Sequence, residues 1–185
     1  MLNRYSEDAM NIKLSLLVPV LVALLAGCGE MPKTPDEYRT ALQGHPNMVG
    51  VRIEHFDVNL PMSQVAQFVK KKSTECLQRT IRVTSSTSSG GMTTSYSDNL
   101  VKYQAYAEIS PAKATIYVTE TVANLKGEQK QEPYFSFVMD VKPDTGRKSK
   151  VDLYYTWGEP RPRMAKALTA WAGGSDVGCP NLAAR

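Results

Sequence analysis

The chain has 185 residues, of which 42% are hydrophobic and 22% charged, and its formal net charge at pH 7 is +4. This balance excludes an intrinsically disordered chain, which has few apolar residues and a high net charge, and it supplies enough apolar residues for a buried core. The two compact basic runs, at 70–72 and 147–150, contain no interleaved aromatic residues. Nucleic acid is therefore not an expected partner.

The first distinctive feature is a basic head with Lys13, followed by an apolar run at 14–25 and small residues before a cysteine. The run of about twelve residues is shorter than the roughly 20 that cross a bilayer, and it is typical of the hydrophobic part of a signal peptide. Glu7 and Asp8 place acid where a signal peptide has positive charge, so we expect translation to start at Met10. A transmembrane anchor and a plain secretory signal are the alternatives.

The residues Leu25-Ala26-Gly27-Cys28 resemble the lipobox of bacterial lipoproteins. This resemblance implies that the thiol of Cys28 receives a diacylglycerol, that the chain is cut before it, and that the new amino end is acylated. We expect residues 1–27 to be the signal peptide and 28–47 to be a lipidated N-terminus and tether, with a short helix capped by Asp36. Two or more acyl chains anchor a protein stably. Gly29 in place of an aspartate implies, by the enterobacterial pattern, the outer membrane and a domain facing the periplasm.

Residues 48–185 have the size of a single domain. In the oxidising periplasm Cys76 and Cys179 are expected to form a disulfide. Two buried free thiols or a metal pair are the alternatives, although no nearby His or Cys completes a ligand set. A bond between them would tie an early helix to the C-terminal tail.

The early elements follow from hydrophobic periodicity. A period of two predicts a strand over 49–58, and its phase shift near Glu54-His55 predicts a bulge or a twist there. Apolar residues at helical spacing predict a helix over 61–77. A short strand at 80–85 precedes a Ser/Thr-rich run, which is expected to form a loop or a hairpin tip.

Alternating strands separated by turns at 103–109, 114–122, 134–141 and 151–155 predict an antiparallel meander. A final helix over 163–172 is expected to bury Met164, Ala167, Leu168 and Trp171. The predicted fold is α+β, an antiparallel sheet of about five to six strands with two helices on one face. This element order resembles helix-grip domains, in which a curved sheet wraps a C-terminal helix.

Catalytic motifs are absent from the sequence, which contains neither HExxH, GxSxG, CxxC, a P-loop nor GxGxxG. Of the two histidines, His45 falls in the expected tether and His55 on the first strand. Alternation would place His55 and Asp57 on one strand face, a pair without a nucleophile. We therefore predict no enzymatic activity, no cofactor and no metal site.

Two functions remain open. The first is a non-enzymatic interaction or accessory module at the outer membrane with an unidentified envelope protein partner. The second is a carrier of a lipid-like or small apolar ligand between the sheet and the last helix. The aromatic residues fit either, because they can form core and cross-strand pairs or line a pocket. An open apolar cleft of a few hundred cubic ångströms would favour the carrier, and a sealed core the interaction module.

Replacing Cys28 by serine is expected to abolish lipidation, because a hydroxyl does not take the place of the thiol that receives the diacylglycerol. Metabolic labelling with palmitate measures this directly. Cys76→Ser is the matched control and should keep its label. Label in the Cys28 variant, or none in the native protein, would contradict the lipoprotein interpretation.

Overall fold

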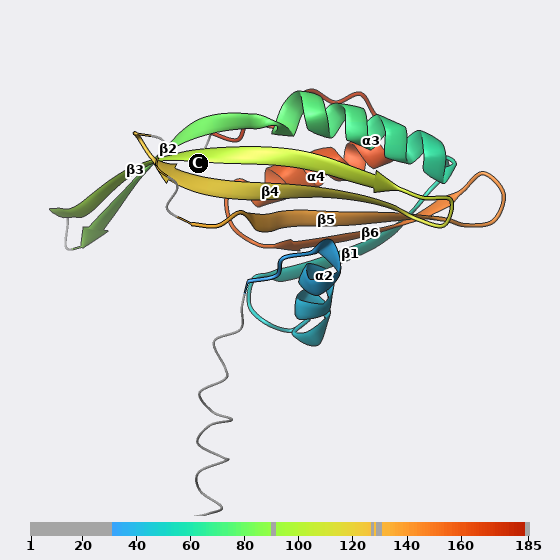
Figure 1. Ribbon diagram of the computed structural model, residues 1–185, viewed down its shortest axis with the longest axis horizontal. Coiled ribbons are helices and arrows are strands. Elements are labelled where there is room, and N and C mark those ends of the chain that lie inside the picture. The colour runs from blue at the N-terminus through green and yellow to red at the C-terminus, as the bar shows by residue number, and fades with distance from the viewer. Residues whose placement is uncertain (1–30, 90–91, 127, 129–130, 184–185) are drawn as a thin grey trace, which may run out of the picture. The chain divides into compact units, whose positions relative to one another are not determined.

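The computed structural model describes residues 31–89, 92–126, 128 and 131–183, and the compact unit begins at Pro32 (Figure 1). The expected start at Met10, the cleavage site and Cys28 lie outside the described residues. Among the described residues, no helix is long and apolar enough to cross a membrane.

One six-stranded antiparallel sheet forms the centre of this unit, in the order β1-β6-β5-β4-β3-β2. The strands are β1 (Val51–Val58), β2 (Arg79–Ser89), β3 (Met92–Ile109), β4 (Ala114–Asn124), β5 (Tyr134–Pro143) and β6 (Ser149–Thr156). The strands β2 to β6 follow one another as a meander, and β1 pairs with β6. The predicted α+β class and the predicted meander are confirmed.

Three helices in the described part of the chain cover the sheet. The helices α3 (Met62–Leu77) and α4 (Arg161–Ala172) lie on one face, and α2 (Pro35–Gly44) lies on the other (Figure 1). Two helices on one face were predicted from the sequence, whereas the packing of α2 on the opposite face was not. The helix-grip resemblance rests on element order and stays a prediction.

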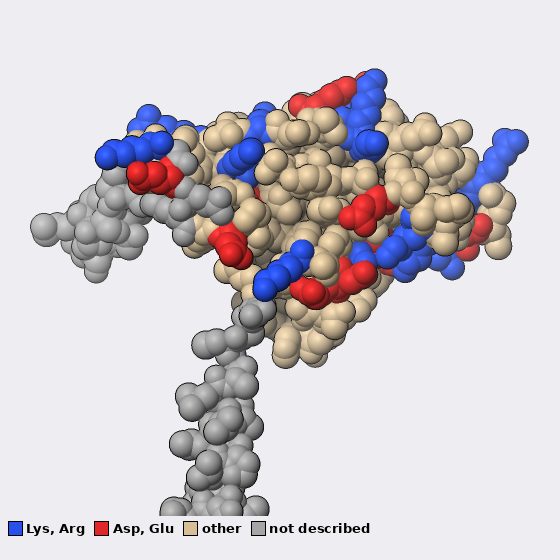
Figure 2. Space-filling model, viewed as in Figure 1, with Lys and Arg blue, Asp and Glu red and all other residues tan. Residues whose placement is uncertain are grey.

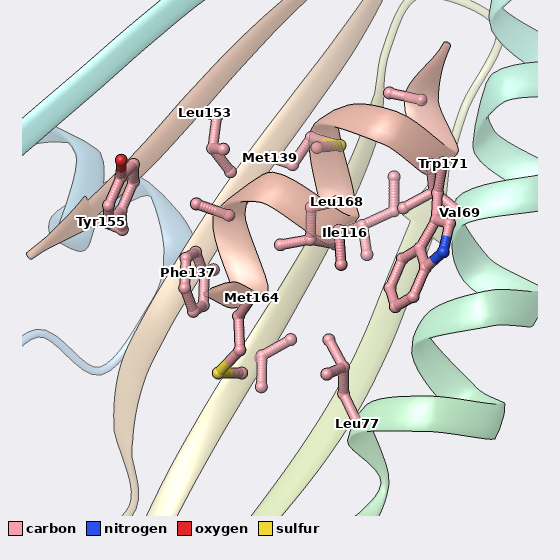
Figure 3. Close-up of a cluster of buried hydrophobic side chains, with 14 of the residues drawn as sticks. Val69, Leu77, Ile116, Phe137, Met139, Leu153, Tyr155, Met164, Leu168 and Trp171 are labelled. Atoms are coloured by element: carbon pink, nitrogen blue, oxygen red, sulfur yellow. The ribbon is translucent and has the colours of Figure 1, made fainter. Parts of the chain in front are cut away.

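The main core lies between the sheet and the pair α3 and α4 (Figure 3). Trp171 is fully buried, and its Nε1 donates a hydrogen bond to the carbonyl of Val177 at 2.9 Å. Met164, Ala167 and Leu168 are buried with it, which confirms the predicted stripe. Each large apolar side chain that is buried in this way contributes about 1.5–3 kcal/mol. This layer is therefore the principal source of stability.

A second cluster, called here the α2 cluster, lies on the opposite face. It contains Tyr38, Leu42, Val51, Phe135, Val138 and Tyr154. Val51 and Ile53 of β1 pack in it, whereas Val58, with Phe56 beside it, packs in the main core. The pairing of β1 with β6 is regular throughout, so of the two predicted alternatives at Glu54-His55 the bulge is wrong. The hydrophobic phase changes along β1 because its two ends are covered on opposite faces.

The helix α2 was expected to be part of a tether, and it belongs to the compact unit instead. Its Arg39 Nη1 lies 2.9 Å from Oδ1 of Asp140, a buried carboxylate in β5. Thr34, not Asp36, caps the helix, because the backbone N–H of Glu37 donates to the Thr34 hydroxyl. The expected domain boundary at residue 48 is therefore corrected to Pro32.

The Ser/Thr-rich run forms a ribbon rather than a loop. The strands β2 and β3 pair as far as Ser89 and Met92, and residues 90 and 91 between them are not described. The ladder between β3 and β4 ends at Asn99, so the ribbon extends beyond the rest of the sheet (Figure 1). This agrees with the hairpin-tip alternative.

The predicted disulfide between Cys76 and Cys179 is present, with the two Cα atoms 5.0 Å apart. It joins the last turn of α3 to the tail after α4. In that tail Leu182 is buried in the main core, and the carbonyl of Pro180 accepts a hydrogen bond from Arg79 Nη2 at 2.7 Å. The bond therefore secures the tail against the sheet.

Replacing either Cys76 or Cys179 by serine should lower the free energy of unfolding by roughly 2–5 kcal/mol, since the bond closes a long loop in the unfolded chain. Denaturant unfolding under oxidising conditions measures the loss. A double variant should lose about as much as either single one, because both remove the same bond. The wild-type protein can also be denatured without a reductant and treated with an alkylating reagent. Modification of both Cys76 and Cys179 would contradict the disulfide itself.

Candidate functional site

A cleft of about 660 Å³ opens at the end of the sheet where β4 ends and β5 begins. It is formed by β2, β3, β4 and β5, by the start of α4 and by the C-terminal tail. The volume is in the range of small-molecule and peptide-side-chain sites. We therefore take this cleft as the candidate site.

The lining is mainly polar. Seven side chains contribute polar groups, namely Arg82, Thr84, Tyr103, Glu120, Tyr134, Glu159 and Arg161. The tail supplies Leu182 and Ala183 as part of the wall. An apolar, lipid-like ligand would strip water from these polar groups without replacing their hydrogen bonds, which is unfavourable.

The most buried charged group of the lining is the carboxylate of Glu120, whose residue is 4% exposed. Glu120 lies in the same alternating series of β4 as Ile116 and Val118, so its side chain points toward the main core. Three donors surround it: the Tyr134 hydroxyl at 2.7 Å, the Ser136 hydroxyl at 2.5 Å and Arg161 Nη2 at 3.3 Å. A buried carboxylate is tolerated because these groups satisfy it.

A β-bulge in β5 supplies one of these donors. The register between β4 and β5 shifts so that Val118 faces Phe137 while Thr119 faces Phe135, which leaves Ser136 as the extra residue. Such a bulge re-aims a side chain. Here it turns the Ser136 hydroxyl toward Glu120.

Arg161 is the first residue of α4 and follows a cis peptide bond between Glu159 and Pro160. Its guanidinium lies 6.0 Å from the centre of the Tyr134 ring. Its Nη2 donates to Glu120, whereas its Nε is buried without a hydrogen-bond acceptor among the described residues. A buried unsatisfied donor costs free energy, so an acceptor that reached Nε would bind favourably.

Two tyrosines of the cleft stay protonated over a wide pH range. Burial raises the pKa of Tyr103 and of Tyr134 above the ordinary value, and the negative charge of Glu120 raises both further. The positive charge of Arg161 lowers both pKa values, but burial and the charge of Glu120 outweigh it. At neutral pH both residues are therefore neutral phenols.

The charged side chains around the cleft are paired. Arg82 Nε lies 2.8 Å from Oδ1 of Asp98, and Arg163 forms an ion pair with Glu159. Over the face drawn in Figure 2, basic and acidic side chains lie beside one another rather than in patches of one sign. The cleft thus presents hydrogen-bonding groups more than net charge.

The residues singled out from sequence lie apart from the cleft centre. Cys28 is outside the described residues, and the Cys76–Cys179 bond secures the tail that forms one wall. His55 does not pair with Asp57, because its Nδ1 contacts Oδ1 of Asp152 on β6 at 2.7 Å. In the part of the chain that the structure describes, no group of three His, Cys, Asp or Glu residues could bind a metal.

Burial acts to raise the pKa of Asp152, but hydrogen bonds from Lys142 and His55 outweigh it and lower the value. The Lys142 Nζ lies 2.8 Å from Oδ2 of Asp152. This exposed cluster lies on the α2 side of the sheet, and we take it as a surface ion-pair network.

The aromatic residues divide between the two expected roles. Tyr134 lines the cleft, and Phe137, Tyr155 and Trp171 are buried in the main core. Tyr103 does both, because it is buried in the main core and also lines the cleft. Glu120 and Arg161 were missed from sequence. The signal for Glu120 was a carboxylate in phase with the apolar residues of its strand, whereas Arg161 carried no comparable signal.

Compared with protein-family models and with curated proteins, the sequence matches none.

We expect Glu120→Gln to lower the pKa of Tyr134, because the substitution removes the negative charge that disfavours the phenolate. The native contribution of this tyrosine to stability is complete below about pH 10, the pKa of an unfolded tyrosine, and is lost as the pH rises toward the folded value. A pH titration by NMR of ring-labelled tyrosine, assigned with Tyr134→Phe, measures the change. Tyr155, whose pKa is raised to about 12 by burial and by Glu54, is the internal control and should not move. An unchanged Tyr134 would contradict the network.

Proposed function

We propose that this protein is a bacterial lipoprotein, anchored through Cys28 to the outer membrane, that acts as a non-enzymatic interaction module in the periplasm. Its binding site is the cleft, which takes a polar segment of an envelope protein partner. The observation that carries the proposal is the polar, charge-paired lining around Glu120 and Arg161. Groups of this kind recognise main-chain amides and polar side chains by hydrogen bonds.

Two further observations support the location. The lipobox-like residues Leu25-Ala26-Gly27-Cys28 provide the anchor, and the disulfide between Cys76 and Cys179 agrees with an oxidising compartment. The three cysteines thus have compatible roles, one for lipid and two for the bond.

The arrangement favours recognition over catalysis. The Glu120 carboxylate accepts from three protein donors, including a guanidinium, and these occupy most of its acceptor sites. A general base must instead reach a proton of the substrate. Glu120 therefore acts as the acceptor that orders Tyr134 and Arg161 at the cleft.

The volume of about 660 Å³ also favours a second candidate, a binding protein for a small polar molecule. The lipid-like ligand considered from sequence fits the polar lining less well. A protein partner agrees better with a cleft that is open to solvent beside the edge strand β2.

Photo-crosslinking in intact envelopes tests the proposal. A photoreactive amino acid is placed at Thr84, an exposed cleft residue, or at Lys148, an exposed residue in the β5–β6 turn. We expect a discrete protein adduct from position 84 and none of that size from position 148.

The cleft is then filled to show that the adduct depends on it. Ala183→Trp is an exposed substitution in the cleft wall, and Ala112→Trp is the same change in the β3–β4 turn. The first should abolish the adduct and the second should leave it intact. Equal adducts in both variants, or the same adduct from position 148, would contradict the protein partner, and an adduct with a small molecule would favour the second candidate.

A further inference from the structure

We propose that the end of the sheet where β1 begins and β6 ends lies on the phospholipid bilayer, with Met48, Val49 and Trp157 in the interfacial region. These three residues are called here the apolar end patch. The inference rests on the proposed lipid anchor at Cys28 and adds a second, protein-made contact with the membrane.

The patch consists of large apolar side chains that the fold leaves in water. Val49 is 99% exposed, Met48 64% and Trp157 61%. Single exposed apolar residues are common on proteins, but here three lie together. The backbone N–H of Trp157 donates to the carbonyl of Gly50, which places Trp157 beside the turn that carries Met48 and Val49.

The exposure of Met48 and Val49 follows from the backbone conformation of the turn that carries them. The N–H of Met48 donates to the carbonyl of His45, and the N–H of Val51 donates to that of Met48, each at 3.0 Å. Gly50 has a φ of 96°, which L side chains rarely adopt, so the turn is built for a glycine at this point. Val51 enters the α2 cluster, while Val49 stays outside it.

The tether makes the bilayer the natural occupant of the patch. Three residues separate Cys28 from Pro32, where the compact unit begins, so the Cα atoms of Cys28 and Pro32 are at most about 14 Å apart. Tyr38, one turn into α2, shares the α2 cluster with Val51, the first residue of β1. In Figure 1 the described chain starts at the end of the sheet where β1 begins. An anchor on so short a tether therefore brings this end to the membrane.

The chemistry of the patch suits the same occupant. A tryptophan combines an apolar ring with an N–H donor and is enriched where membranes meet water. Met48 and Val49 can enter the apolar side of this boundary while the indole stays near the headgroups. The acyl chains supply the attachment, and the patch fixes the orientation of the domain.

Fluorescence of the full lipidated protein in vesicles tests this. The chain has two tryptophans, and Trp171 is fully buried, so the difference between the native protein and Trp157→Phe isolates Trp157. The vesicles contain phosphatidylethanolamine, phosphatidylglycerol and a brominated phosphatidylcholine. We expect the Trp157 signal to be quenched by the brominated lipid and protected from iodide in solution. Val49→Ser should weaken the quenching, and Ile109→Ser, at an exposed apolar residue at the end of β3, should not.

The outcomes separate the patch from the anchor. A protein that takes up no palmitate overturns the anchor and, with it, the inference built on it. A palmitate-labelled protein whose Trp157 is quenched by iodide and not by brominated lipid overturns the patch alone. Protection from both quenchers would show that a second copy or another protein covers the patch, and this also overturns the bilayer as its occupant.

Discussion

The strand β5 is buried on both faces, and this constraint determines much of the structure. Its residues 135–141 are all buried, so a covering layer is needed on each side. The helices α3 and α4 provide one layer and α2 the other. Asp140 faces α2 with 2% exposure, and Arg39 and Thr115 hydrogen-bond its carboxylate. The helix that buries this carboxylate thus also supplies its closest cation, Arg39, while Lys113 lies 3.9 Å away. Replacing Arg39 with α2 in place would remove that partner from a buried charge, at a cost of several kcal/mol.

Toward β2 the sheet is covered less completely by helices. The cleft lies in this less covered part. The α4 layer begins only at Arg161, so the end of the sheet near Tyr134 is covered by a side-chain network and by the tail rather than by a helix. At this end of the sheet Leu182 of the tail covers apolar core residues, and Glu120 with its three donors forms the polar part of the cover. The disulfide at Cys179 limits how far the tail can leave. The cleft is therefore shaped by a helix start, a bulge and a covalent bond together.

The elements that follow from local pattern were predicted from the sequence. The meander, the stripe of α4 and the cysteine pair each depend on periodicity, turn residues or compartment. The place of α2 was not predicted, because a helix of 10 residues with modest apolar content looks like a tether when its partner surface is unknown. The partner surface was nonetheless signalled by β5, where Phe137, Val138 and Met139 are consecutive apolar residues, since a strand covered on one face would alternate.

Two other features required the three-dimensional structure for a different reason. The phase shift in β1 has two physical causes with the same sequence pattern, a bulge or a change of covered face, and only the pairing with β6 distinguishes them. The bulge that does exist, at Ser136, lies in a run of buried residues where alternation carries no signal. Glu120 was visible in principle, because a carboxylate among core-facing positions must have donors nearby. Arg161 could be identified as its partner only once α4 was in place.

The proposed anchor, the apolar end patch and the cleft have a joint consequence for the partner. Trp157 precedes Glu159 and Arg161 by only two and four residues, so the patch and one side of the cleft belong to the same connection between β6 and α4. A domain held with that end on the bilayer would present the cleft close to the lipid surface. The four residues before Pro32 are too few to carry the domain across the periplasm. On this proposal the partner would have to come to the membrane surface, which favours a protein embedded in the same membrane or lying on it.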